Sequence, residues 1–356
     1  MPALQNKYFL PAHNQRGAAL MLLLLLVSVG ALAVFVSGLN RSSDQQERDR
    51  FTTQALARAK EALIGYVAMR QDPERPGDAS CPDNSADGNY DGTQDAPCGN
   101  NPAAPRLGRL PWKTAVVGGA PTVTEGLGLD IVDGYGERLW YAVSRNLVDP
   151  AGVAQFNPLL LAAPPAARRP WITVRDSLGN VVSDRVAAIF LAPGIALAGQ
   201  LRSGATPTAG QYFDNLAVGG VNYSNADSDD CLDGTVCVTV ASRTGEDFII
   251  APRSETFNDV LAFVTIDELM VAIDRRVANE IRARLEVNPT FPASLGDIDV
   301  SSWPNWFNDN GWSDGTVTTY TRLDDDNASI RFTGCASTFS YVWSGGKAVL
   351  TWDSAC

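Results

Sequence analysis

The chain has 356 residues, of which 45% are hydrophobic and 19% charged, and it carries a formal net charge of -12. This composition is typical of a folded protein with a core, and it excludes disorder for most of the chain. The acidic balance argues against a nucleic-acid partner, because no basic surface is available to neutralise phosphates. The single histidine, His13, lies near the amino terminus, which excludes Ser-His-Asp, Cys-His and histidine-zinc mechanisms for the segments that follow it.

The amino-terminal segment is polar, carries Lys7 and Arg16 and contains no acidic residue. An uncharged apolar run, Ala18–Leu39, follows it and would extend about 33 Å as a helix, so it predicts a transmembrane segment that begins in the cytoplasm. The run is too long for the apolar core of a secretory signal, which has about 7–15 residues. Apolar residues continue at helical spacing through Asp44–Arg70, so we expect one long helix over 18–70, apolar first and then amphipathic.

This pattern resembles the type IV pilin superfamily, which includes the pseudopilins of type II secretion. The resemblance rests on the segment QRGAALM (15–21) and on the long helix after it. It implies a leader over 1–17, cleavage by prepilin peptidase between Gly17 and Ala18, and methylation of the new terminus. It also implies an inner-membrane anchor with the C-terminal part in the periplasm, and a helix that later packs against other pilin-like subunits in a pilus or pseudopilus.

The sequence departs from this family at one position. Major pilins carry a glutamate at the fifth mature position, whereas this chain has Leu22 there and no acidic residue before Asp44. A carboxylate in apolar surroundings is costly unless it is paired, so its absence changes the way in which subunits assemble. Within the family, subunits that lack this glutamate are often those at the filament tip, which implies a minor or tip-located subunit.

Six cysteines follow the apolar run, and an even number in an oxidising compartment predicts three disulfides. Sequence alone leaves 15 connectivities open, but short spacing favours pairing in chain order, which gives Cys81-Cys98, Cys231-Cys237 and Cys335-Cys356. The last pair has independent support. Alternating apolar residues on both sides of a Gly-Gly turn predict a hairpin over 339–352, in which Phe339 faces Trp352 and Cys335 faces Cys356 on the same side.

The loop between the first two cysteines resembles a calcium-binding loop. Oxygen-bearing side chains occupy alternating positions around Gly88, and they are Asp83, Ser85, Asp87, Asn89 and Asp91. The twelfth position is Gln94 rather than glutamate, so the bidentate ligand is missing unless Asp95 takes its place. Calcium is therefore one prediction for this loop, and a solvated loop that its disulfide holds without a metal is the other.

The globular part predicts an α+β fold. Strand-like runs at Arg138–Val143, Trp171–Arg175 and Val186–Leu191 indicate a β-rich extracytoplasmic domain over 71–254. A second amphipathic helix begins after the Thr265 cap and runs to Leu285, and antiparallel strands follow it. In full, we expect a long N-terminal transmembrane and amphipathic helix followed by a β-rich, pilin-like globular part with an antiparallel sheet and a second helix. The order of elements over 255–356 also allows a second pilin-like lobe.

Four aromatic residues gather in the loop after the second helix, namely Trp303, Trp306, Phe307 and Trp312. They predict a surface that binds sugar rings or a partner by stacking. The alternative is that they cover the end of a sheet.

The sequence therefore favours a non-enzymatic, pilin-like minor or tip-located subunit, with prepilin peptidase and other pilin-like subunits as partners. No nucleophile motif supports an enzyme, and we expect no cofactor other than the predicted calcium. A single-pass, membrane-anchored binding or adhesin domain is the alternative, and an anchored hydrolase that uses two carboxylates is a weaker one.

Overall fold

The structure is a computed structural model that describes residues 16–71, 74–84, 88–95, 98, 106–113, 116–117, 120–121, 126–148, 155–162, 171–203, 206, 208–226, 247–287, 290–335 and 337–353. The chain divides into two units, residues 1–50 and 51–356. Helix α1 (Arg16–Ala68) contributes to both. Its side chains are described from Met21 to Gly30 and from residue 43 onward.

The prediction of a transmembrane helix over Ala18–Leu39 is wrong for the described part of the chain. Among the residues described, no helix is both long enough and apolar enough to cross a membrane.

The larger unit is built on a six-stranded sheet whose central strand is β6 (Val181–Ala192). One edge of β6 pairs with β10, and the opposite edge pairs with β4 and β5, which lie one after the other along it. These pairs are antiparallel, whereas β9 pairs with β5 in parallel. The partner strands are β1 (Leu107–Arg109), β4 (Trp140–Val143), β5 (Ile172–Arg175), β9 (Asp247–Ile249) and β10 (Val260–Thr265).

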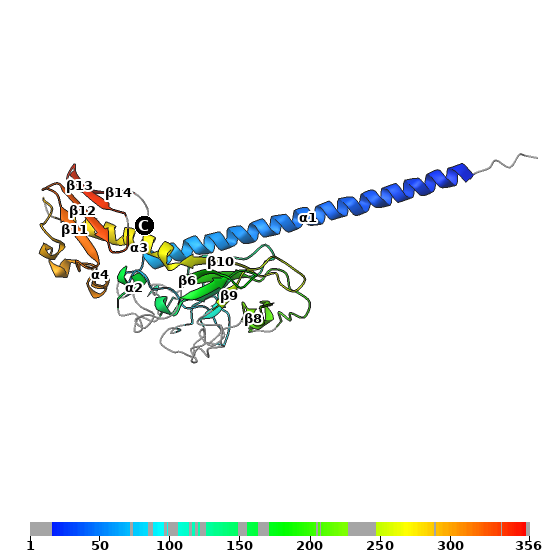
Figure 1. The fold of residues 1–356 in the computed structure, drawn as a ribbon, viewed down its shortest axis with the longest axis horizontal. Coiled ribbons are helices and arrows are strands. Elements are labelled where there is room, and N and C mark those ends of the chain that lie inside the picture. The colour runs from blue at the N-terminus through cyan, green and yellow to red at the C-terminus, as the bar shows by residue number, and fades with distance from the viewer. Residues whose placement is uncertain are drawn as a thin grey trace, which may run out of the picture. The chain divides into compact units, whose positions relative to one another are not determined.

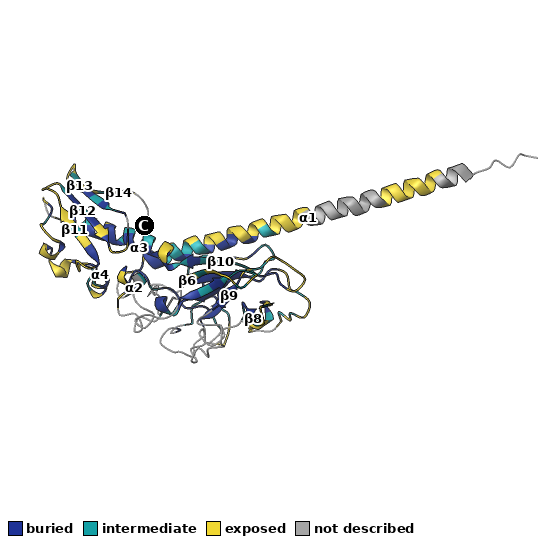
Figure 2. Ribbon diagram, viewed as in Figure 1, coloured by how far each residue is buried: buried dark blue, intermediate teal, exposed yellow. Residues whose placement is uncertain are grey.

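Both faces of the sheet are buried, so β6 reads in the sequence as a continuous apolar run rather than as an alternating one. Phe190 faces a core that includes the second part of α1 and helix α3, whereas Ile189 faces a second core with Trp140, Tyr212 and Phe213. Figure 2 shows dark blue buried ribbon in β6 and on one side of α1 where the helix runs beside β10. The sheet is therefore a middle layer, with helices on one face and loop segments on the other.

The amphipathic part of α1 packs through small and apolar residues at helical spacing. The buried ones in this stretch are Ala55, Leu56, Ala59, Leu63, Val67 and Ala68. At the margin of this face, Lys60 Nζ lies 2.8 Å from an oxygen of Glu268 on α3. The hydroxyl of Thr52 accepts a hydrogen bond of 3.0 Å from the backbone N–H of Gly134. The alternation of buried and exposed positions that the sequence predicts for Asp44–Arg70 is thus present from residue 52 onward.

Helix α3 (Ile266–Leu285) follows β10 directly and links the first sheet to a second one. Its start is the predicted capping box, in which Thr265 accepts from the backbone N–H of Glu268 and Glu268 accepts from that of Thr265. The second sheet is a meander of four strands (Figure 1), namely β11 (Thr318–Arg322), β12 (Asn327–Phe332), β13 (Phe339–Ser344) and β14 (Lys347–Trp352).

The two sheets share one core. Residues of α1, β6, α3 and β12 all belong to the same buried cluster, and α3 contacts β6 and β10 as well as β14. The predicted boundary between 254 and 255 therefore places β10 apart from β6, although the two strands pair along their length. Helix α3 and the four-stranded sheet do have the order of elements predicted for 255–356.

The predicted register of the last hairpin is confirmed. Strands β13 and β14 pair antiparallel, with Phe339 opposite Trp352, Tyr341 opposite Leu350 and Trp343 opposite Ala348. Phe339, Tyr341 and Ala348 are buried on the face toward α3, where the hydroxyl of Tyr341 donates a hydrogen bond of 3.0 Å to the carbonyl oxygen of Ala278. Gly345 and Gly346 both have positive φ, as a two-residue hairpin turn requires.

Short elements complete the fold. Four of them form two small antiparallel ribbons, β2 (Val116–Val117) with β3 (Ala120–Pro121) and β7 (Asn215–Val218) with β8 (Val221–Ser224). The others are single turns of helix, namely η1 (Arg145–Leu147), α2 (Leu159–Ala162), η3 (Ala209–Gln211), η4 (Leu295–Asp297), η5 (Val300–Ser302) and α4 (Asn305–Asp309).

At the β9 edge of the six-stranded sheet, a side chain forms hydrogen bonds with the backbone of the edge strand. The amide of Asn225 accepts from the backbone N–H of Ile249 at 2.9 Å and donates to the carbonyl oxygen of Ile249 at 3.1 Å. Asn225 is fully buried, so its side chain occupies the position at which a further strand would pair.

Candidate functional site

The predicted cleavage site lies at the start of α1. The helix begins at Arg16, so the peptide bond between Gly17 and Ala18 falls in its first turn. From Met21 to Val29 the large apolar side chains are 55–75% exposed within the chain. Leu22, at the fifth position after the predicted cut, is 65% exposed. The residues from Met21 to Gly30 are all exposed within the chain, and this stretch of α1 is yellow in Figure 2.

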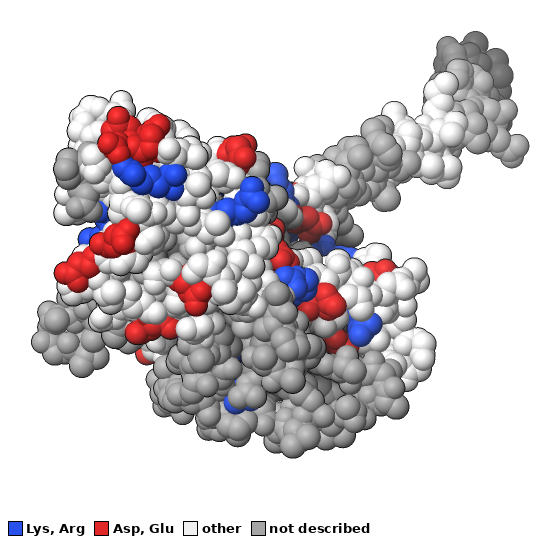
Figure 3. Space-filling view, turned by 60° about the vertical axis from the view of Figure 1, so that its left-hand side comes forward, with Lys and Arg blue, Asp and Glu red and all other residues white. Residues whose placement is uncertain are grey.

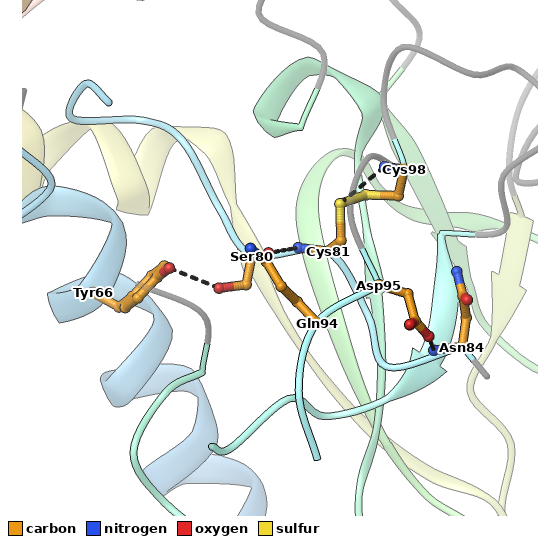
Figure 4. Close-up of a disulfide and its surroundings, with 7 residues drawn as sticks. All are labelled: Tyr66, Ser80, Cys81, Asn84, Gln94, Asp95 and Cys98. Carbon is orange, nitrogen blue, oxygen red and sulfur yellow. Dashed lines mark hydrogen bonds between the residues drawn. A yellow bond between two sulfur atoms is a disulfide. The ribbon is translucent and has the colours of Figure 1, made fainter. Parts of the chain in front are cut away.

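The first predicted disulfide, Cys81–Cys98, is confirmed, with an S–S distance of 2.09 Å. Figure 4 shows the contacts around it. The backbone N–H of Cys81 donates to the side-chain oxygen of Gln94 at 2.9 Å, and the hydroxyl of the preceding Ser80 donates to that of Tyr66 on α1 at 2.8 Å. The disulfide loop is therefore fastened both to itself and to the long helix.

The start of the loop also pairs with the sheet. Asp83 and Arg109 of β1 exchange two backbone hydrogen bonds, of 3.0 Å and 2.6 Å. Gly108 lies beside this bridge, and a Cβ atom there would be 2.3 Å from the carbonyl oxygen of Asp83. Glycine is thus required at 108 by the close approach of the two backbones.

The oxygen atoms proposed for calcium are engaged within the loop itself. Asp83 Oδ2 accepts from the backbone N–H of Gly92 at 2.7 Å. Asp91 Oδ1 accepts from the backbone N–H of Thr93 at 2.7 Å and from its hydroxyl at 2.6 Å, and these bonds lower the pKa of Asp91. Asp95, the candidate replacement at the end of the loop, accepts from the backbone N–H of Asn84 at 2.8 Å.

The remaining predicted calcium ligands are only partly described. Ser85 and Asp87 lie outside the described residues, whereas Asn89 is described. Within the described ranges no group of three acidic, histidine or cysteine side chains gathers that could hold a metal ion. Calcium binding by the complete loop stays a prediction.

The calcium prediction has a direct test in thermal unfolding of the full-length protein after treatment with a chelator. Binding to the folded state would raise its stability by about 3 kcal/mol at a calcium concentration of 100 Kd, and the rise would be lost in Asp87→Asn. Magnesium at equal ionic strength is the control, because it rarely occupies such a loop with high affinity. An unchanged unfolding midpoint up to millimolar calcium would contradict calcium binding. The disulfide and the hydrogen bonds within the loop would then be what holds its conformation.

The other predicted cysteine pairs are only partly described. Cys335 is disulfide-bonded, and its predicted partner Cys356 lies outside the described residues, as do Cys231 and Cys237. The described pairing of β13 and β14 extends from Phe339 opposite Trp352 to Ser344 opposite Lys347. The pair Cys335–Cys356 therefore stays a prediction.

The aromatic residues proposed as a stacking surface are core residues instead. Trp303, Trp306, Phe307 and Trp312 are 0–5% exposed. The rings of Trp303 and Phe307 stack on each other with centroids 4.1 Å apart, and Trp312 packs against Phe332 of β12. Their burial matches the alternative that such residues cover the end of a sheet, because no ring face is left for a sugar or a partner.

Sequence reasoning missed an arginine that is held between aromatic rings. The guanidinium carbon of Arg109 lies 4.6 Å from the ring centre of Trp140 and 4.3 Å from that of Tyr212. Burial lowers the pKa of Arg109, although Tyr212 and Glu137 oppose this shift. These contacts fasten the segment around Tyr212 to the sheet. Because they join residues far apart in the chain, no local pattern predicts them.

Charged side chains are interspersed on the surface. Figure 3 shows a face on which acidic and basic side chains lie among uncharged ones. Several arginines pair with carboxylates across elements or within one helix, including Arg185 with Asp267 at 2.7 Å and Arg282 with Glu286 at 2.5 Å. Paired in this way, these arginines carry little net positive field.

The chain was compared with models of protein families, with curated proteins and with solved structures, and it matched none of them. Its function is therefore inferred from its own residues and geometry.

Proposed function

We propose that the chain is a non-enzymatic, pilin-like minor subunit of a type IV pilus or type II secretion pseudopilus. In this proposal prepilin peptidase cuts the chain between Gly17 and Ala18 and methylates the new terminal amine of Ala18. The helix of the processed chain then packs against the helices of neighbouring subunits. One observation carries the proposal. A helix of 53 residues exposes apolar side chains over Met21–Val29 and buries its far part in the globular core.

An exposed apolar helix of this kind needs a partner. Surface leucines normally occur singly, whereas here a continuous apolar surface surrounds the helix from Met21 to Val29. Burying each leucine side chain fully would contribute about 1.5–3 kcal/mol. The corresponding helices of other subunits offer an apolar surface of the same length and shape, so mutual packing would bury all of these side chains together.

The identity of Leu22 supports a minor or tip-located position. With the cut after Gly17, the new terminal amine belongs to Ala18, and no acidic residue precedes Asp44 to neutralise it. A subunit of this kind offers no carboxylate to the amine of a neighbour. It therefore fits a place in the filament where no such pairing is needed.

The confirmed Cys81–Cys98 disulfide supports a location outside the cytoplasm. Disulfides form and persist in oxidising compartments, of which the bacterial periplasm is one. The proposal therefore places residues 51–356 in the periplasm before assembly and on the outside of the filament afterwards.

Mass spectrometry of the mature amino terminus tests the proposal. In cells that contain prepilin peptidase we expect a terminal peptide that begins at Ala18 and is N-methylated, and in cells without the peptidase we expect the full leader. Gly17→Leu should block cleavage completely, because a large side chain then replaces the glycine at the cut. An intact leader in peptidase-containing cells would refute the proposal.

Gly30→Leu is the matched control for this experiment. It introduces the same side chain into the same helix, and the space around Gly30 is open, with no atom within 4 Å of the added Cβ. Cleavage after Gly17 should therefore proceed normally in Gly30→Leu. Loss of cleavage in both variants would mean that the helix as a whole was disturbed and not the cut itself.

A further inference from the structure

Two buried aspartates, Asp214 and Asp259, bind each other's backbone. The backbone N–H of Asp214 donates to Asp259 Oδ2 at 2.9 Å. The backbone N–H of Asn258, the residue before Asp259, donates to Asp214 Oδ2 at 2.7 Å. Asp214 is 7% exposed and Asp259 6% exposed. The two carboxyl groups thus form a reciprocal clamp between segments that are 45 residues apart.

Amide groups complete the clamp. Gln200 Nε2 donates to Asp214 Oδ1 at 2.7 Å, and Asn225 Nδ2 donates to Asp259 Oδ2 at 3.1 Å. Within the described part of the chain, Asp259 Oδ1 has no hydrogen-bond donor from another residue's amide. The cation that acts on Asp214 is Arg202.

Arg202 is already committed to other groups. Its guanidinium donates to the carbonyl oxygens of Gly194 and Pro193 at 2.6 Å and 3.0 Å, and it lies 3.7 Å from a carboxylate oxygen of Glu137. Arg202 thus acts on both Glu137 and Asp214, and Arg109 lies 4.0 Å from the other oxygen of Glu137. Arg202 cannot neutralise a second carboxylate at Asp259.

Two carboxylates in such a buried site cannot both ionise at little cost, so they hold a proton between them. Burial raises the pKa of Asp259 well above its usual value, and the neighbouring charge of Asp214 raises it further. Burial also raises the pKa of Asp214, against the hydrogen bond from Asn258. When Asp259 is protonated, its Oδ1, which lacks an amide donor, can carry the proton and donate a hydrogen bond to Asp214.

The clamp joins a covering segment to the sheet. Asp214 directly follows Tyr212 and Phe213, whose rings pack on Trp140 of β4 with centroids 5.3 Å and 5.4 Å apart. Asp259 directly precedes β10. Residues 208–226, which we call the covering segment, include η3, β7 and β8. Its first part shields the aromatic face of the six-stranded sheet through Tyr212 and Phe213, whereas β7 and β8 pack against Ile249 and Phe257.

We propose that the Asp214–Asp259 pair is a proton-dependent latch that holds the covering segment over the sheet and releases it when the shared proton is lost. The closed state binds one more proton than the open state, in which both carboxyl groups are solvated and ionised. Opening therefore becomes more favourable as pH rises from the ordinary carboxyl range toward the raised pKa of the pair. Once the proton is gone, two negative charges lie in the buried site against one shared arginine.

Hydrogen exchange of the full-length protein measures the latch directly. We expect protection of the amides of β7 and β8, corrected for intrinsic exchange rates, to fall at least about tenfold between about pH 6 and about pH 9. In Asp259→Asn the protection should stay constant over this range, because asparagine keeps an N–H donor toward Asp214 and has no proton to lose. Amides of β13 and β14 serve as an internal reference, since they lie on the other sheet.

Asp184→Asn is the matched control, because Asp184 is an exposed carboxylate on β6 and takes no part in the clamp. In this variant the amides of β7 and β8 should lose protection as pH rises, to the same extent as in the wild type. Constant protection in the wild type would overturn the proposal by itself, which keeps the test decisive even when Asp259→Asn does not fold. An equal loss in the wild type and in Asp259→Asn would also overturn it.

Discussion

Replacing Asp274 by asparagine should raise the free energy of unfolding at pH 7 by about 3 to 4 kcal/mol. Asp274 lies in α3, is 2% exposed, and its Oδ1 has no hydrogen-bond partner among the described residues. Burial alone raises its pKa from the ordinary 3.8 to about 8. The folded protein therefore keeps this carboxyl group neutral at pH 7, whereas the unfolded chain ionises it, and asparagine has the same shape without this penalty.

The sign of the pH dependence follows from the same shift. Between about pH 4 and about pH 8 the folded state binds more protons at Asp274 than the unfolded state, so stability falls as pH rises, by up to about 1.4 kcal/mol per pH unit. Urea unfolding at several pH values measures this slope. In Asp274→Asn the slope should be smaller by the contribution of one proton, while the pair Asp214–Asp259 still contributes its own.

The exposed Asp184→Asn variant again serves as the control, because it removes a carboxylate that the fold does not bury. Its stability at pH 7 should lie within about 0.5 kcal/mol of the wild type. A slope that is the same in Asp274→Asn and in the wild type would contradict the assignment of a neutral carboxyl group at 274.

Removing the confirmed disulfide with the double variant Cys81→Ser, Cys98→Ser should lower the free energy of unfolding by about 3 kcal/mol. The two cysteines have a sequence separation of 17. In the chain-entropy model, closing a loop of this length lowers the conformational entropy of the unfolded chain, which corresponds to about 3 kcal/mol of stability. Urea unfolding followed by far-UV circular dichroism measures the change. The variant should still fold, because the backbone bridge between Asp83 and Arg109 is independent of the sulfur atoms.

A loss of less than about 1 kcal/mol would contradict this expectation. It would mean that the contacts of the loop, such as Gln94 with the N–H of Cys81 and Asp83 with that of Gly92, already restrict the chain in the absence of the covalent bond. Thr93→Val, which removes one hydroxyl hydrogen bond in the same loop, gives the scale for such a non-covalent contact.

Local signals explain which parts of the fold the sequence predicts well. The hairpin register over 339–352 follows from a Gly-Gly turn and from alternation on both sides of it, because shifting the register by one residue would turn every apolar side chain outward. The start of α3 follows from Thr265 and Glu268, which satisfy each other's backbone N–H groups. In both cases the interacting residues are close in the chain.

The parts that sequence reasoning missed depend on distant residues. Strand β6 pairs with β4, β5 and β10, and no pattern within β6 specifies these three partners. The tryptophans near 303–312 give the same signal whether they face solvent or the core. Likewise, the apolar run predicts a helix at Met21–Val29. Its composition does not specify which other molecule or segment packs against that helix.

The side chain of Asn225 has a consequence for solubility. A strand at the rim of a sheet offers unpaired N–H and C=O groups to any other extended chain, and this is a common route to edge-to-edge aggregation. In this protein the side-chain amide of Asn225 forms hydrogen bonds with both the N–H and the C=O of Ile249 in the edge strand β9. Because Asn225 also bonds to Asp259, protection of the rim depends on the same carboxyl pair that holds the covering segment. The side chain of this single asparagine therefore hinders edge-to-edge self-association at β9.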